Sequence, residues 1–67
     1  FKIVKAGFSQ PRKQLAGNLS KKLKLEKERV IAWLQKNNIN PSQRAETLKI
    51  EGWINLTKTI YNVIINL

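Results

Sequence analysis

Apolar side chains recur at three- and four-residue intervals along most of this chain, which is the spacing of one face of an α-helix. The longest such series contains Ile50, Trp53, Ile54, Thr57, Ile60, Tyr61 and Ile64. The β-branched run 63–65 would also suit a strand, but the chain offers it no partner strand. The sequence therefore predicts an all-α fold.

The first main helix is expected at about residues 10–21. Ser9 can cap its amino end, and Pro11 falls in the first turn, where a missing backbone N–H costs nothing. Its apolar stripe consists of Leu15, Leu19 and Leu23. Before it, an amphipathic turn or two at residues 1–8 would bury Phe1, Val4 and Phe8 in the core or against a neighbouring domain.

Two further main helices are expected at residues 26–37 and 50–64, with a short helical turn at about 42–47 between them. The stripe of the earlier helix consists of Val30, Trp33 and Leu34, with Ile31 at its edge. Trp33, Trp53 and Tyr61 all fall on apolar stripes, so core packing is expected rather than base stacking. The prediction is one domain over residues 1–67, a small bundle of three main helices plus short helical turns.

Size and composition exclude several classes of function. The chain has 67 residues and contains neither cysteine nor histidine. Disulfides and thiolate or imidazole metal ligands are thereby ruled out, and neither a catalytic residue nor a metal site is predicted. No apolar run is long enough to span a bilayer. A chain without cysteine fits the cytoplasm.

Positive charge is concentrated in the first third of the chain. The formal net charge is +9, and residues 1–24 contain seven Lys or Arg residues and no acidic residue. Such a one-sided excess attracts polyanions, either nucleic acid or an anionic membrane. The alternative is that these side chains serve solubility alone.

Helical spacing divides the basic pair Arg12–Lys13. On a helix continuous from Phe8, Arg12 shares the face of the leucine stripe and would form a structural ion pair with Glu46. Arg12→Ala is then expected to lower stability more than affinity for nucleic acid. Lys13 lies on the opposite face, with Lys21 and Lys24 following it and Lys22 flanking them, in a row suited to phosphates.

Gly17 falls on this basic face, inside the predicted helix. A glycine in a helix interior costs roughly 0.5–1 kcal/mol relative to alanine. One interpretation is that Gly17 lets a nucleic-acid backbone approach closely. The other is that the helix ends or kinks near residues 16–18.

Three blocks carry a resemblance to a known family. They are Phe8-Ser9-Gln10-Pro11-Arg12-Lys13-Gln14-Leu15 with Asn18-Leu19, then Ile39-Asn40-Pro41-Ser42-Gln43-Arg44-Ala45-Glu46-Thr47-Leu48, then Ile50-Glu51-Gly52-Trp53-Ile54-Asn55-Leu56. In order and spacing they resemble the C-terminal helical domain of the ribosomal RNA small-subunit adenine N6-dimethyltransferases. Lys49, Trp53 and Gly17 depart from the usual pattern, which concerns local packing.

The resemblance implies a parent enzyme that uses S-adenosylmethionine to dimethylate adenines of 16S-type rRNA during small-subunit ribosome biogenesis. The cofactor loop and the catalytic motif belong to a preceding domain, so this chain is expected to be a fragment without catalytic or cofactor-binding residues. Its expected partners are small-subunit rRNA, or the pre-ribosomal small subunit, and its own catalytic domain, with no membrane. Its expected role is to bind and position rRNA.

Two other functions remain open from the residues. A stand-alone basic helical protein would also bind nucleic acid, although the last helix carries few cations for a recognition helix. A membrane-active helical peptide is the third alternative. The mean hydropathy of −0.38 favours a soluble domain over it.

Overall fold

The computed structural model describes residues 2–65, with the backbone alone described at positions 62, 64 and 65. Within that part the chain is helical and contains no strand, which confirms the predicted all-α class. The elements are α1 (Lys2–Gly7), α2 (Leu15–Leu23), α3 (Lys27–Lys36), the 3₁₀ turn η1 (Ala45–Thr47) and α4 (Ile50–Ile65). Phe1 lies outside the described residues, as does the side chain of Ile64.

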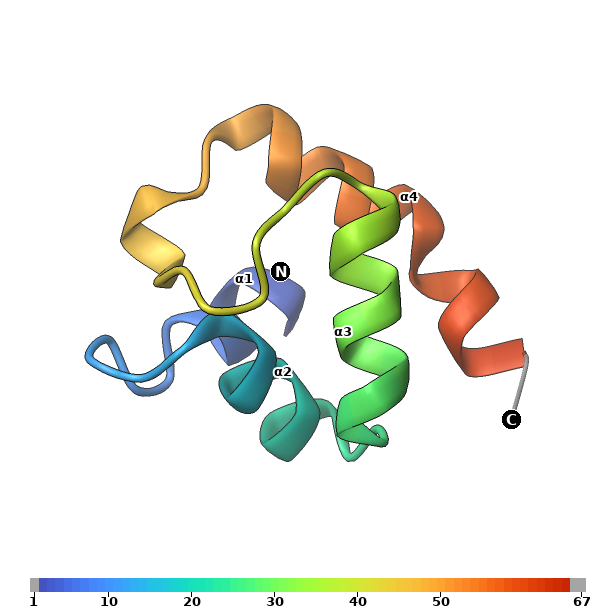
Figure 1. Cartoon of the computed structure of the whole chain (residues 1–67), viewed down its shortest axis with the longest axis horizontal. Coiled ribbons are helices and arrows are strands. Elements are labelled where there is room, and N and C mark those ends of the chain that lie inside the picture. Colours follow the sequence, from blue (N-terminus) through green and yellow to red (C-terminus); the bar gives the residue numbers. More distant parts are fainter. Residues whose placement is uncertain (1, 66–67) are drawn as a thin grey trace.

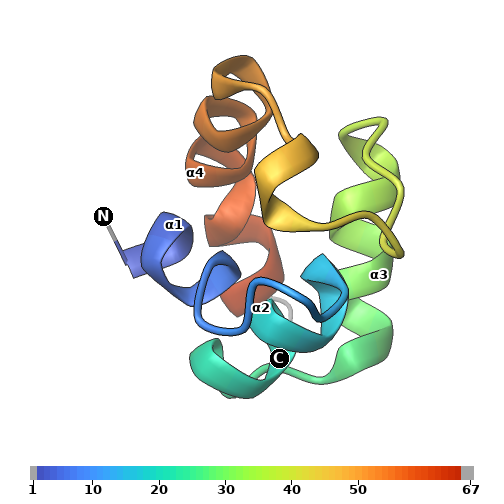
Figure 2. The same ribbon diagram turned by 90° about the vertical axis from the view of Figure 1, so that its left-hand side faces the viewer.

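The four α-helices form a closed ring of contacts. α1 packs on α2, α2 on α3, α3 on α4, and α4 returns to α1. Figure 1 shows α3 upright between α2 and α4, and the segment that joins α1 to α2 projects at the left. Figure 2 looks from that side and shows the same segment in front of the bundle.

The predicted start of the first main helix at residue 10 is wrong. Ser9 ends α1 instead, because its hydroxyl donates a hydrogen bond to the carbonyl oxygen of Ala6 at 2.7 Å. The backbone then turns, and the N–H of Lys13 donates to the carbonyl of Gln10 at 2.9 Å. Pro11 occupies the second position of this turn, where its fixed φ is favourable. The helix begins only after the turn.

The amino end of α2 is satisfied by a distant segment of the chain. The N–H of Leu15 donates to the carbonyl of Gln43 at 2.8 Å, and that of Ala16 to the carbonyl of Pro41 at 3.2 Å. Helix ends need partners for their first N–H groups, and here the turn before η1 supplies them. This tertiary contact sets the start of α2 at Leu15.

The other element predictions are confirmed within a residue or two. α3 and α4 cover the segments expected at residues 26–37 and 50–64, and η1 lies within the turn expected at residues 42–47. The end of α3 also agrees, since Asn37 caps the helix and Asn38 follows in a left-handed conformation with φ 59°. The β-branched run 63–65 is helical.

Leucine, valine and tryptophan side chains from α2, α3 and α4 fill the core. Its large members on these helices include Leu15, Leu19, Val30, Trp33, Leu34, Trp53 and Leu56. The expected core positions of Trp33 and Trp53 are therefore confirmed. Tyr61 was expected beside them, but it is 68% exposed, and that prediction is wrong.

The buried face of α4 differs from the predicted stripe. Trp53, Leu56 and Val63 are buried, whereas Ile50 is 76% and Ile54 48% exposed. α4 is apolar on more than one side, and its contacts with α1 and α3 decide which side is covered. Spacing alone could not make that choice.

The opening helix also buries a different face from the one predicted. Ile3 and Ala6 are buried, while Val4 is half-buried and Phe8 is exposed. Phe8 still contributes to packing, because its ring stacks on that of Trp53 with centroids 5.6 Å apart. Phe8 thus contacts the bundle through Trp53 but is not buried in the core.

Candidate nucleic-acid interface

The basic turn, at residues 10–13, presents Arg12 and Lys13 to solvent. A side chain from α2 holds it in place: the amide Nδ2 of Asn18 donates to the carbonyl of Gln10 at 2.9 Å and to that of Gly7 at 2.8 Å. Asn18 is only 4% exposed. One buried amide thus joins the end of α1, the basic turn and α2.

The structure does not support the division of labour expected of the basic pair. Arg12 stands in a turn and not on a helix, so the spacing that aimed it at the core does not apply. Within residues 2–65, Arg12 and Glu46 form no ion pair, and both side chains are exposed. Arg12 and Lys13 therefore face solvent together.

The carboxyl end of α2 carries the next group of cations. Lys21 and Lys22 are exposed in the last turn, where the helix macrodipole favours positive charge. Lys24 follows in a left-handed conformation, with φ 57° and ψ 44°. That conformation costs a residue with a side chain roughly 1–2 kcal/mol, and glycine is the usual choice there.

Gly17 lies inside α2, which continues without interruption to Leu23. The alternative that the helix ends near residues 16–18 is therefore wrong. A Cβ atom at position 17 would meet no atom within 4 Å, so no packing requires the glycine. Gly17 and Lys21 stand one helical turn apart on the same face.

We use the name basic surface for Arg12, Lys13, Gly17, Lys21, Lys22 and Lys24. α2 spans about 12 Å between its ends, with the basic turn before its first residue and Lys24 after its last. The structure places the five cations along this short helix rather than on one helical face. No acidic residue occurs in the chain before Glu26.

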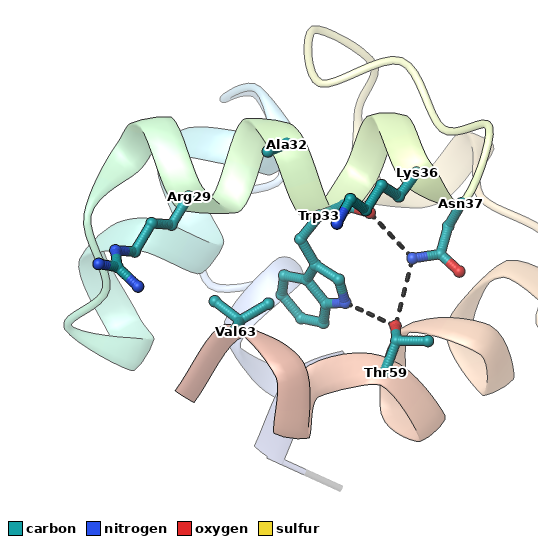
Figure 3. A pocket seen from close by; sticks show the side chains of 7 residues that line it. All are labelled: Arg29, Ala32, Trp33, Lys36, Asn37, Thr59 and Val63. Carbon is teal, nitrogen blue, oxygen red and sulfur yellow. Dashed lines mark hydrogen bonds between the residues drawn. The ribbon is translucent and has the colours of Figure 1, made fainter. Parts of the chain in front are cut away.

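A groove lies between α3 and α4, apart from the basic surface (Figure 3). It has a volume of about 180 Å³, with Arg29 and Lys36 at its edge. On its floor, Nε1 of Trp33 donates to the hydroxyl of Thr59 at 2.7 Å, and Nδ2 of Asn37 reaches the same oxygen at 3.2 Å. These polar groups are satisfied by one another, so they hold α3 to α4. This network could not be predicted from the sequence, because Trp33 and Thr59 are 26 positions apart.

Residues 2–65 contain no group of three or more potential metal ligands. S-adenosylmethionine carries a positive sulfonium, whereas the lining of the α3–α4 groove contains Arg29 and Lys36 and no carboxylate. This groove does not fit the cofactor, and no catalytic step is assigned to it.

Among the described helices, none has both the length and the apolar character needed to cross a membrane.

Comparison with known proteins identifies the family. The chain is 43% identical over 53 residues to ribosomal RNA small subunit methyltransferase A of Dehalococcoides mccartyi, a match that covers 79% of this chain and 18% of that protein. Proteins of the same name from Staphylococcus haemolyticus and Staphylococcus aureus are 39% and 41% identical over 59 residues, covering 84% of this chain and 20% of each protein. No family model matches. The chain therefore belongs to the family of the ribosomal RNA small subunit methyltransferase A proteins, and it spans about a fifth of the length of these relatives.

Proposed function

We propose that this chain binds small-subunit rRNA and positions a methyltransferase on it through the basic surface. One observation carries the proposal: five exposed cations lie at the two ends of α2, in a region of the sequence that has no acidic residue. Lys and Arg contacts to phosphates fix the register and orientation of a protein on nucleic acid. The relatives' name, which specifies small-subunit rRNA, supports the choice of ligand.

Lys24 adds independent support. A lysine in the left-handed region carries a conformational penalty that glycine would avoid. Strained residues of this kind concentrate at functional sites, where the surrounding structure maintains them. A contact between the Lys24 ammonium and a phosphate explains why a charged residue stands at this position.

Gly17 supports a close approach of the RNA. The open space around it shows that the fold tolerates a larger residue, although glycine weakens the helix. A backbone passing between the basic turn and Lys21 would lie directly over this position. We expect Gly17→Gln to fold at least as well as the native chain and to bind RNA more weakly, with a substitution of the exposed Asn55 of α4, Asn55→Gln, as the control. Unchanged affinity in Gly17→Gln would remove this role.

In the proposed enzyme, methyl transfer from S-adenosylmethionine to adenine N6 takes place in a catalytic domain that precedes these residues. The present residues contribute binding and orientation, which raises the effective concentration of the target adenine at that domain. The work of such an enzyme in small-subunit biogenesis would place it in the cytoplasm. The coding sequence upstream of Phe1 tests this parentage. A cofactor-loop motif followed by an Asn-Leu-Pro-Tyr-type motif is expected there, and an unrelated upstream sequence would contradict it.

A direct binding experiment tests the role of the 67-residue chain. Its affinity for a small-subunit rRNA fragment, measured by fluorescence anisotropy, should fall as salt is added. About five neutralised phosphates give a slope of log affinity against log salt near −3 to −5. Salt-insensitive binding, or no binding at low salt, would contradict the proposal.

A further inference from the structure

A basic cleft lies between α1 and α2, apart from the turn that carries Arg12 and Lys13. It is lined by Lys2, Lys5, Ala6, Ser9, Lys22 and Leu23 and has a volume of about 580 Å³. Pockets of about 300–1,000 Å³ accommodate ligands the size of a nucleotide. The cleft is open to solvent, so an anion can reach its lysines.

The cleft has one sign of charge. Lys2 and Lys5 come from α1, and Lys22 comes from the last turn of α2, so the fold brings together residues up to 20 positions apart. All three side chains are exposed, and the lining contains no carboxylate. A cleft lined by charges of one sign concentrates the field and attracts ions of the opposite sign.

The chemistry of the lining selects the kind of ligand. Ala6 is buried and Leu23 half-buried, which provides an apolar floor for the lysine stems while their ammonium groups stay in water. The hydroxyl proton of Ser9 is already donated to the carbonyl of Ala6 at 2.7 Å, so Ser9 has no proton left for an anion. Recognition therefore falls to the lysines, which act as point charges without fixed geometry.

We propose that this cleft holds a backbone phosphate of the same RNA, as an anchor additional to the basic surface. The inference rests on the proposed function, and it adds Lys2 and Lys5 to the RNA-binding residues. Lys22 belongs to both groups and makes the cleft continuous with the carboxyl end of α2. The chain thus contacts RNA from α1 as well as from α2.

Charge-matched variants test the cleft. Lys2→Gln/Lys5→Gln removes two charges from it, and Lys49→Gln/Lys58→Gln removes two exposed charges next to and on α4. With the rRNA fragment, the cleft variant should lose about 0.7–0.9 from the magnitude of the salt slope, because the cleft holds one phosphate and each phosphate contact contributes about that much. The control should keep the native slope. If the two variants have equal slopes and equal melting temperatures, the cleft does not bind an RNA phosphate. The proposed role of the basic surface is unaffected by that result.

Titration with sodium pyrophosphate separates the two proposals. In an NMR titration of the native chain, the amides of Lys5, Ser9 and Lys22 should shift, and Lys2→Gln/Lys5→Gln should abolish those shifts. If pyrophosphate leaves these amides unmoved, the cleft is not an anion site, whatever the RNA result. If they shift but the native chain binds no RNA, the proposed function fails, RNA is excluded as the ligand, and the anion site remains.

Discussion

Asn18 shows how much can depend on one side chain. It is buried, and its amide reaches two backbone carbonyls on either side of Ser9. The sequence did contain a signal for it, since Asn18 is a polar residue directly beside Leu19 of the apolar stripe. The partners were not predictable, because they depend on a turn that replaces the expected helix.

Asn18→Ala should destabilise the chain by about 1–3 kcal/mol, because the carbonyls of Gly7 and Gln10 would lose buried partners. Urea unfolding followed by circular dichroism measures the change. Asn55→Ala, on the exposed side of α4, is the control and should stay within about 0.5 kcal/mol of the native chain. Equal stabilities for the two variants would show that the amide does not hold the turn.

Lys24 leads to a prediction that separates stability from RNA affinity. Lys24→Gly should be more stable than Lys24→Ala by about 1 kcal/mol, because only glycine relieves the left-handed conformation. Both variants should bind RNA with a salt slope smaller by about 1 in magnitude. Thermal unfolding and anisotropy titrations test the two effects separately. Native RNA affinity in both variants would remove Lys24 from the basic surface.

At the level of elements, the sequence predicted the existence of the helices better than the start of α2. α3 and α4 have strong apolar spacing, and their bounds differ from the predictions by one residue. α2 failed because Ser9 and Pro11 suit a helix start locally, whereas the N–H groups of Leu15 and Ala16 find acceptors in the turn at residues 41–43. The start of α2 is therefore set by a tertiary contact. Because the helix begins at Leu15, Arg12 lies in the preceding turn and not on the core-facing side of a helix.

Two glycines in neighbouring helices should respond oppositely to the same substitution. A Cβ at Gly7 would lie 2.5 Å from Cη2 of Trp53 and 3.1 Å from Cδ1 of Leu15, so Gly7→Ala should destabilise the chain by about 1–3 kcal/mol. Gly17→Ala meets open space and should stabilise it by about 0.5–1 kcal/mol. Urea midpoints of the two variants provide the measurement. A stabilised Gly7→Ala chain would contradict the close packing of α1 on α4.

For the whole molecule, the charge distribution was readable from the sequence, and its arrangement in space was not. Residues 1–24 hold seven of the thirteen Lys and Arg residues, and the fold gathers them on α1, the basic turn and α2. Helical spacing assigned Lys13, Gly17, Lys21 and Lys24 to a single face. The structure distributes the cations around both ends of α2 and brings Lys2 and Lys5 beside Lys22. The composition thus predicted an anionic partner, while the contact residues needed the fold.

The salt dependence of RNA binding tests the central claim most directly. We compare the native chain with Arg12→Gln/Lys13→Gln/Lys21→Gln and with a control of equal charge, Lys36→Gln/Lys49→Gln/Lys58→Gln. The native slope should lie near −3 to −5, and the first variant should lose about 2–3 of its magnitude with an unchanged melting temperature. The control should retain the native slope. If the control loses as much as the first variant, or if native binding does not depend on salt, the basic surface does not bind RNA.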